Sequence, residues 1–164
     1  MDVTTQIDYP GASVADVMGI VLDPKFRAAV CEATMAIDHQ VVIQRGEGGS
    51  AVVTVNRTMP AAVPDFVRRF VGETIALVQT ETWRPDDGSG TRRADLTLSI
   101  VGQPASMAGS IVIAKTSDGV RETVSGGLVV SVPFIGRKIE AEIAKGIVAA
   151  AREEQETGRA WLSA

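Results

Sequence analysis

The C-terminal part of the chain carries an isoleucine at every fourth position from residue 135 to residue 147. Apolar residues at this spacing lie on one face of an α-helix, so residues 134–159 are predicted to form one amphipathic helix. Its apolar face comprises Ile135, Ile139, Ile143, Ile147, Val148 and Ala151. Pro133 suits the start of this helix, and Gly158 is predicted to end it. A helix of about 25 residues, rising about 1.5 Å per residue, is long enough to cross a whole sheet.

Seven segments ahead of this helix are rich in β-branched residues and mostly alternate between apolar and polar side chains, a pattern that predicts strands. The segments are Val3–Tyr9, Ile37–Arg45, Ala51–Met59, Glu73–Arg84, Arg93–Ile100, Met107–Ser117 and Val120–Val130. Turn residues separate most of the later segments, which are therefore predicted to pair as antiparallel hairpins.

Two short helices are predicted between the first strand and the second. Ser13 stands three residues before Asp16, which is the spacing of a helix-capping box. The Asp23-Pro24 pair ends that helix, because a residue before proline disfavours the helical conformation. A second helix is predicted to begin there, with Phe26 and Val30 on its inner face.

The last hairpin carries Asp118-Gly119, a strong signal for a two-residue turn. That turn predicts pairing of Ser117 with Val120, Lys115 with Glu122, Ile113 with Val124 and Ile111 with Gly126. Opposite charges and apolar side chains would then meet across the strands. Gly126-Gly127 is predicted to mark a bend or bulge.

These elements predict an α+β, helix-grip fold. An antiparallel sheet with one apolar face must cover that face, so the prediction is a curved sheet of about seven strands wrapped round the long C-terminal helix. Two short helices follow the first strand. No stretch of the sequence marks a linker, and residues 1–164 are expected to form one domain.

Four segments carry a resemblance to known proteins: Pro64–Gly72, Gln79–Trp83, Gly102–Pro104 and Val132–Glu140. The predicted arrangement of elements resembles the START-like superfamily (SRPBCC proteins), which includes birch-pollen-allergen-like proteins and polyketide cyclases. With these segments, the sequence is more closely similar to the bacterial domain-of-unknown-function family 2505. The resemblance covers nearly the whole chain and implies a cavity between sheet and long helix, which opens near the loops and short helices. It carries over no catalytic residues.

Composition argues against several other classes. The net charge of −4 does not suit a nucleic-acid-binding surface, which is usually basic. The lone cysteine, Cys31, allows neither an intramolecular disulfide nor a multi-thiolate metal site. No metal site and no cofactor are predicted. The sequence shows no signal peptide and no membrane-spanning stretch, so the protein is expected in the cytoplasm.

Polar residues on the inward phase of the strands indicate one end of a pocket. The hypothesis is that Arg57 pairs with Glu81, with His39 and Gln79 nearby, because buried charges need partners. The alternative is that these strand ends protrude, since a one-residue bulge turns every such side chain outward. Trp83 is in the same phase and suits packing better than ligand contact.

The predicted ligand-binding set combines these polar residues with apolar ones on the strands, the connection after the second hairpin strand, and the long helix. It comprises His39, Val55, Arg57, Met59, Phe66, Phe70, Leu77, Gln79, Glu81, Trp83, Leu98, Met107, Ile111, Ile139 and Ile143. A filled core without a ligand is the competing interpretation, because proteins are normally close-packed.

The predicted function is to bind or carry a small hydrophobic molecule, lipid-like or polyketide-like. One alternative is a cyclase-like or hydrolase-like enzyme with His39 or Glu81 as general acid or base. The sequence has no hydrolase nucleophile elbow and no nucleotide-binding loop, so no catalytic residue is assigned and the non-enzymatic interpretation is favoured. The other alternative is a protein-interaction module using residues 60–70, although a lid over the pocket is preferred for that segment.

Overall fold

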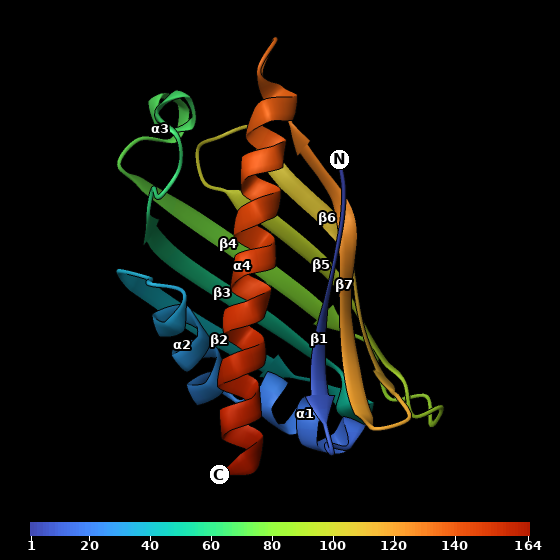
Figure 1. Cartoon of the computed structure of the whole chain (residues 1–164). Helices are drawn as coiled ribbons and strands as arrows, with labels where there is room; N and C mark the ends of the chain where they lie inside the picture. The colour runs from blue at the N-terminus through green and yellow to red at the C-terminus, as the bar shows by residue number, and fades with distance from the viewer.

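The computed structural model describes residues 1–164 and confirms the predicted α+β helix-grip architecture. Seven strands form one antiparallel, curved sheet in the order β1-β7-β6-β5-β4-β3-β2 (Figure 1). The strands are β1 (Asp2–Pro10), β2 (Asp38–Arg45), β3 (Ala51–Pro60), β4 (Thr74–Trp83), β5 (Arg92–Ile100), β6 (Ala105–Lys115) and β7 (Gly119–Val130). The first strand in sequence therefore joins the last strand and forms one edge of the sheet.

Four α-helices accompany the sheet: α1 (Val14–Val21), α2 (Pro24–Ala33), α3 (Asp65–Val71) and α4 (Gly136–Ser163). Figure 1 shows α4 crossing one face of the sheet, with α1 and α2 beside its C-terminal end and α3 beside its N-terminal end. A short 3-10 turn, η1 (Glu47–Gly49), joins β2 to β3. No helix combines the length and the apolar character that crossing a bilayer demands.

The two short helices begin as the sequence predicts. The Ser13 side chain accepts a hydrogen bond from the Asp16 amide, and the Asp16 side chain accepts one from the Ser13 amide, which completes the capping box. Asp23 caps α2 by accepting from the Lys25 amide, with Pro24 in the first turn. Phe26 and Val30, on the predicted inner face of α2, pack with Ile20 of α1 and against Trp161 and Leu162 of α4.

The predicted end of the long helix at Gly158 is wrong, because α4 continues to Ser163. Gly158 is buried inside the helix against the ring of Tyr9. A Cβ atom at this position would lie 2.5 Å from Cε1 of Tyr9. The glycine therefore permits close approach of α4 to β1 instead of ending the helix.

The predicted register of the last hairpin is wrong by two residues. Lys115 pairs with Val120, and the loop spans residues 116–119, closed by a hydrogen bond from the Thr116 amide to the Gly119 carbonyl of 2.9 Å. Gly119 does not adopt a positive φ, and it pairs with Pro10 of β1. Pairing with β1 therefore determines the conformation of this turn.

A displacement of two residues leaves each side chain on its predicted face but changes its partners. Ile113, not Lys115, lies opposite Glu122, so the predicted surface ion pair does not form. The pairing continues through Gly126 and Gly127 without a bulge. At Gly126 the strands approach so closely that a Cβ atom would lie 2.6 Å from the Ala108 carbonyl oxygen.

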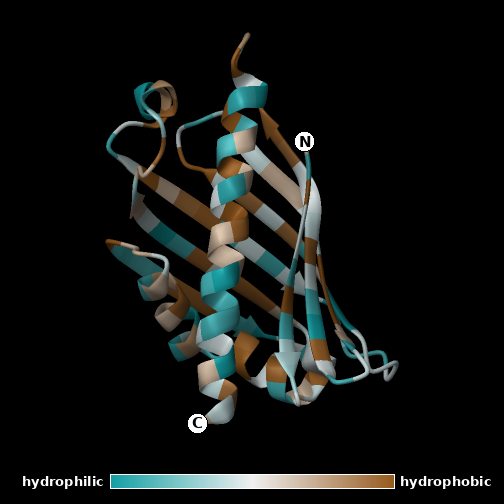
Figure 2. Cartoon of the chain, in the orientation of Figure 1, coloured by the Kyte–Doolittle hydropathy of each residue, from teal (hydrophilic) through white to brown (hydrophobic).

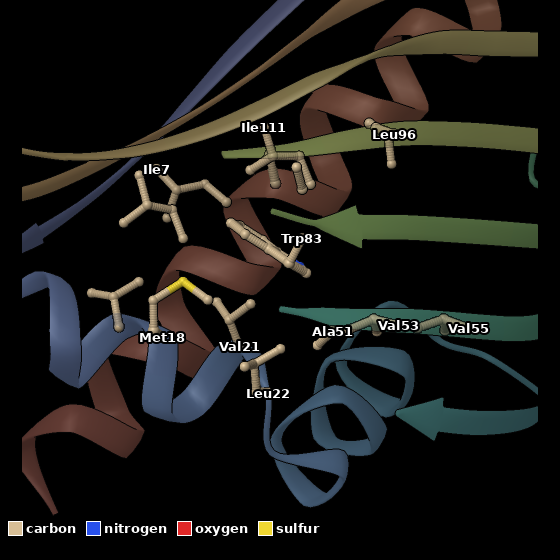
Figure 3. Close-up of a cluster of buried hydrophobic side chains, with 14 of the residues drawn as sticks. Ile7, Met18, Val21, Leu22, Ala51, Val53, Val55, Trp83, Leu96 and Ile111 are labelled. Carbon is tan, nitrogen blue, oxygen red and sulfur yellow. The ribbon is translucent and has the colours of Figure 1, made fainter. Parts of the chain in front are cut away.

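The main core lies between the sheet, α1 and the C-terminal half of α4. Alternating hydropathy along the strands is visible in Figure 2. Trp83 is fully buried in this core, and Figure 3 shows it between side chains of α1, such as Met18 and Val21, and the strand residues Ile7 and Ile111. A second, smaller cluster around Val67 of α3 packs on the other end of α4.

Candidate functional site

A cavity of about 80 Å³ lies between the sheet and α4. Its apolar lining comes from strands β1, β5, β6 and β7 and from α2 and α4: Ile7, Val30, Leu96, Leu98, Met107, Ile111, Val124, Ile147, Ala150 and Ala151. Its polar lining is Thr5, Arg57, Gln79, Glu81, Glu122 and Glu154. The cavity therefore combines an apolar wall with an unusual number of ionisable side chains.

Glu81 is the centre of the polar cluster. It is 1% exposed, and its carboxylate accepts hydrogen bonds from Arg27 of α2, at 2.5 Å, and from the Trp83 indole N–H, at 2.9 Å. Its other oxygen accepts from Gln79 Nε2, at 2.7 Å. The predicted direct pair between Arg57 and Glu81 is wrong, because Arg27 takes that place.

The Arg27 guanidinium forms hydrogen bonds to α1 as well as to Glu81. Its Nε donates to the Val21 carbonyl oxygen at the end of α1, at 2.8 Å. Burial alone would lower the pKa of this guanidinium, but the charge of Glu81 and the hydrogen bond between them raise the pKa above its ordinary value. Arg27 and Glu81 thus form a buried ion pair that joins the α1–α2 corner to the middle of the sheet.

Arg57 of β3 lies beside this pair. Its guanidinium contacts the oxygen of the Gln79 side chain at 3.5 Å and the Thr34 hydroxyl at 3.4 Å. Gln79 therefore links Arg57 to Glu81. Arg57 is half-buried and forms no ion pair with a carboxylate, and its Nε has no acceptor.

Glu122 of β7 lies opposite Ile7 of β1 and Ile113 of β6, and all three side chains share the inner face. It is 3% exposed, and its Oε2 has no hydrogen-bond partner. Burial, together with the charges of Glu154 and Glu81, holds the pKa of Glu122 well above its ordinary value. A buried carboxyl without a donor is costly when ionised, so Glu122 favours its neutral form.

Glu154 reaches the same cavity from α4. Its neighbours Glu153 and Glu156 are exposed, whereas Glu154 is half-buried and lines the cavity. Its Oε1 is inaccessible and has no partner. Burial raises the pKa of Glu154 above its ordinary value, with the charge of Arg27 acting in the opposite direction.

The hydroxyl of Tyr9 is a further buried polar group without a partner. Burial raises the pKa of Tyr9, and the charges of Glu122 and Glu154 raise it further. The phenol therefore stays protonated and keeps its hydroxyl as a potential donor. No group of three or more His, Cys, Asp or Glu side chains is arranged to hold a metal ion, the glutamates of the cavity included.

The structure divides the predicted ligand-binding residues into several groups. Those along the cavity are Arg57, Gln79, Glu81, Leu98, Met107 and Ile111. Val55 and Trp83 are part of the main core, whereas Phe70, Leu77, Ile139 and Ile143 pack in or against the smaller cluster. Helix α3 therefore covers the smaller cluster, and Phe66 of this helix is exposed.

His39 and Met59 lie outside the cavity lining. His39 pairs with Arg57 in the β2–β3 ladder, but its Nε2 lies 3.7 Å from the Glu32 carboxylate near the surface. Met59 is half-buried near the end of β3. Both positions follow the inward strand phase, yet the cavity does not extend to them.

Comparison with known proteins places residues 4–162 under one family model, described as "Protein of unknown function (DUF2505)". An uncharacterized protein of Mycobacterium tuberculosis is 28% identical over 119 residues, which cover 71% of this chain and 68% of that protein.

Solved structures share the fold at low sequence identity. A protein from Thermus thermophilus superposes with a TM-score of 0.65 and 14% identity, covering 98% of this chain and 99% of that one. The Zhui aromatase/cyclase from a Streptomyces species gives 0.55 and 10%, covering 99% and 92%. The STAR-related lipid transfer protein from Xanthomonas axonopodis gives 0.57 and 14%, covering 98% and 84%. Lipid-transfer and cyclase proteins thus use this same fold.

Proposed function

The chain belongs to the DUF2505 family, and we propose that it binds a small, mainly apolar molecule in the cavity between the sheet and α4. The body of the ligand contacts the apolar wall formed by residues such as Leu98, Met107 and Ile111. Its polar group meets the ionisable side chains at the same cavity.

One observation carries this proposal: buried polar atoms without partners are grouped around this cavity. The atoms are Oε2 of Glu122, Oε1 of Glu154 and Nε of Arg57, three residues that line the cavity. Leaving buried polar groups unpaired is costly, and proteins normally satisfy them. A ligand with a polar group, or water in its absence, supplies the missing partners.

The size of the cavity limits the ligand. Pockets for drug-sized ligands typically measure about 300–1,000 Å³, several times the volume found here. A compact molecule fits with little change, whereas a lipid chain requires α4 to move away from the sheet. Two neighbours of the same fold are named as a lipid transfer protein and an aromatase/cyclase, which supports a ligand in this position.

The test is the intact mass of natively purified protein under non-denaturing conditions, followed by extraction with organic solvent. We expect a discrete mass excess and a matching compound in the extract. Ala150→Phe, which places a ring in the cavity, should remove the excess. Ala149→Phe, on the exposed side of the same helix, should retain it. An unmodified mass after incubation with fatty acids, sterols, aromatic polyketides and short alkyl compounds would contradict ligand binding.

A second candidate, catalysis in the same cavity, rests on the two carboxyls with raised pKa. A carboxyl whose pKa is raised keeps its proton to higher pH and can act as a general acid, as buried glutamates do in several enzymes. A Glu122→Gln variant that retains the extracted ligand but loses its conversion would favour catalysis over simple binding.

A further inference from the structure

The ionisable groups around the cavity do not balance in charge when all of them are ionised. Two guanidinium groups, from Arg27 and Arg57, face three carboxyls, from Glu81, Glu122 and Glu154. The Arg27 charge is committed to Glu81. Arg57 is half-buried and its hydrogen bonds go to neutral side chains. When all three carboxyls are ionised, at least one therefore has no formal counter-charge, which agrees with the neutral form that Glu122 favours when no cation is bound.

The two carboxyls without partners enter from opposite layers of the fold. Glu122 projects from β7 of the sheet, and Glu154 projects from α4, which covers that sheet. Both line the same cavity, and neither has a donor for the oxygen atom that is buried and unpaired. A group placed between sheet and helix at this point meets acceptors on both sides.

The chemical complement of two facing acceptors is a group with several donors. An ammonium group offers three N–H donors and one positive charge, so it satisfies both oxygens and supplies the missing counter-charge. A carboxylate ligand offers only acceptors and would add a further negative charge beside two glutamates. Arg57 alone favours such an anion; its Nε has no acceptor, but its two terminal nitrogens already bond to the neutral Thr34 and Gln79 side chains.

We propose that the cavity selects small ligands bearing a basic amine, with the ammonium group held between Glu122 of β7 and Glu154 of α4. The apolar part of the ligand lies against Met107, Ile111 and Ile147. This inference rests on the proposed ligand-binding function and narrows its chemistry. It also assigns a role to Glu122 and Glu154, each of which has one buried carboxyl oxygen without a hydrogen-bond partner.

Three probes of similar size separate the alternatives: n-butylamine, 1-butanol and butyrate. The readout is the NMR signals of the methyl groups of Met107, Ile111 and Ile147 in protein with labelled methyl groups, titrated at neutral pH. We expect saturable shifts with butylamine at a Kd at least tenfold below those of the other two probes. Glu122→Gln and Glu154→Gln should each weaken butylamine binding by tenfold or more, and the exposed neighbour Glu153→Gln should leave it unchanged.

The outcomes distinguish the two proposals. Binding of 1-butanol or butyrate at least as tight as that of butylamine would overturn the amine inference and leave ligand binding intact. Equal binding of butylamine by the wild type and both glutamine variants would also overturn it. If none of the probes moves these methyl signals, the amine inference fails, and the extraction experiment then decides whether ligand binding itself stands.

Discussion

The backbone of Gly158 in α4 lies against the ring of Tyr9 in β1, at the point where the long helix meets the edge of the sheet. Gly158→Ala is expected to destabilise the protein, although alanine favours helix by about 1 kcal/mol over glycine. The added Cβ would lie 2.5 Å from Cε1 of Tyr9, and neither backbone can shift without disturbing the core.

Gly146 in the same helix provides the matched control, because a Cβ there meets no atom within 4 Å. Gly146→Ala is therefore expected to stabilise by up to about 1 kcal/mol. Chemical denaturation of both variants measures the two effects. A stabilised Gly158→Ala protein would show that the contact with Tyr9 is loose.

We expect the free energy of unfolding to depend strongly on both partners of the buried ion pair, Arg27 and Glu81. Arg27→Met leaves Glu81 charged and buried, which typically costs about 3–5 kcal/mol. The double variant Arg27→Met/Glu81→Met should lose less than the sum of the single changes, since no unpaired charge remains. Arg84→Met breaks the exposed pair with Asp95 and should cost no more than about 1 kcal/mol. Additive single effects in the double-mutant cycle would contradict the coupling.

The raised pKa of Glu122 predicts the sign of a pH effect. The folded protein holds this proton more tightly than the unfolded chain, so the contribution of Glu122 to folding stability is greatest at low pH and is lost as the pH rises through the folded-state pKa. Glu122→Gln cannot ionise and should escape this loss. Its advantage over the wild type in thermal midpoint should therefore grow from pH 5 to pH 8.

Glu154→Gln should show the same trend, because burial raises the pKa of Glu154 as well. Glu153→Gln serves as the control, since an exposed residue without such contacts typically changes stability by no more than about 0.5 kcal/mol. A constant difference between Glu122→Gln and wild type across the pH range would show that Glu122 does not titrate abnormally in the folded state.

The C-terminus of α2 offers a simple stabilising change. Met35 has φ 68°, and the hydrogen bonds from Met35 N–H to Glu32 and from Ala36 N–H to Cys31 define a Schellman motif. Glycine is preferred at this position, and the Met35 side chain is mostly exposed, so Met35→Gly should stabilise by roughly 0.5–1 kcal/mol. Ala29→Gly, inside the helix, should destabilise by about 1 kcal/mol. Thermal unfolding of both variants is the measurement, and a destabilised Met35→Gly protein would be the contrary result.

The fold was predictable because its main signals are local. Alternation along the strands, the four-residue spacing of isoleucines in α4 and the Ser13 cap each follow from short stretches of sequence. The two wrong predictions, the end of α4 at Gly158 and the register of the last hairpin, arise where a strand distant in sequence determines the local structure. Gly158 and Gly119 both carry turn or stop signals, but each is a glycine because β1 lies against it.

The site was predictable only in part for the same reason. The inward phase of β3 and β4 indicates Arg57, Gln79 and Glu81 correctly as cavity-lining residues. Glu122 has the same inward phase as Val120 and Val124. The predicted ion pair with Lys115 assigned Glu122 to a different role, so it was not predicted as a cavity residue. Glu154 stands three residues after Ala151 on the apolar stripe of α4, and its neighbour Glu153 is exposed. Nothing in the local sequence indicates that Arg27, not Arg57, reaches Glu81.

The pairing of β1 with β7, which sets Asp2 opposite Gly127, has a consequence for the synthesis of the chain on the ribosome. About 110 residues separate the two strands, and at about 5–20 residues per second the first strand waits roughly 6–20 s for its partner. Until then β1 is an unpaired strand beside an unfinished sheet, open to pairing with other chains. A chaperone that holds β1 during this interval would therefore increase the yield of folded protein without altering its final stability.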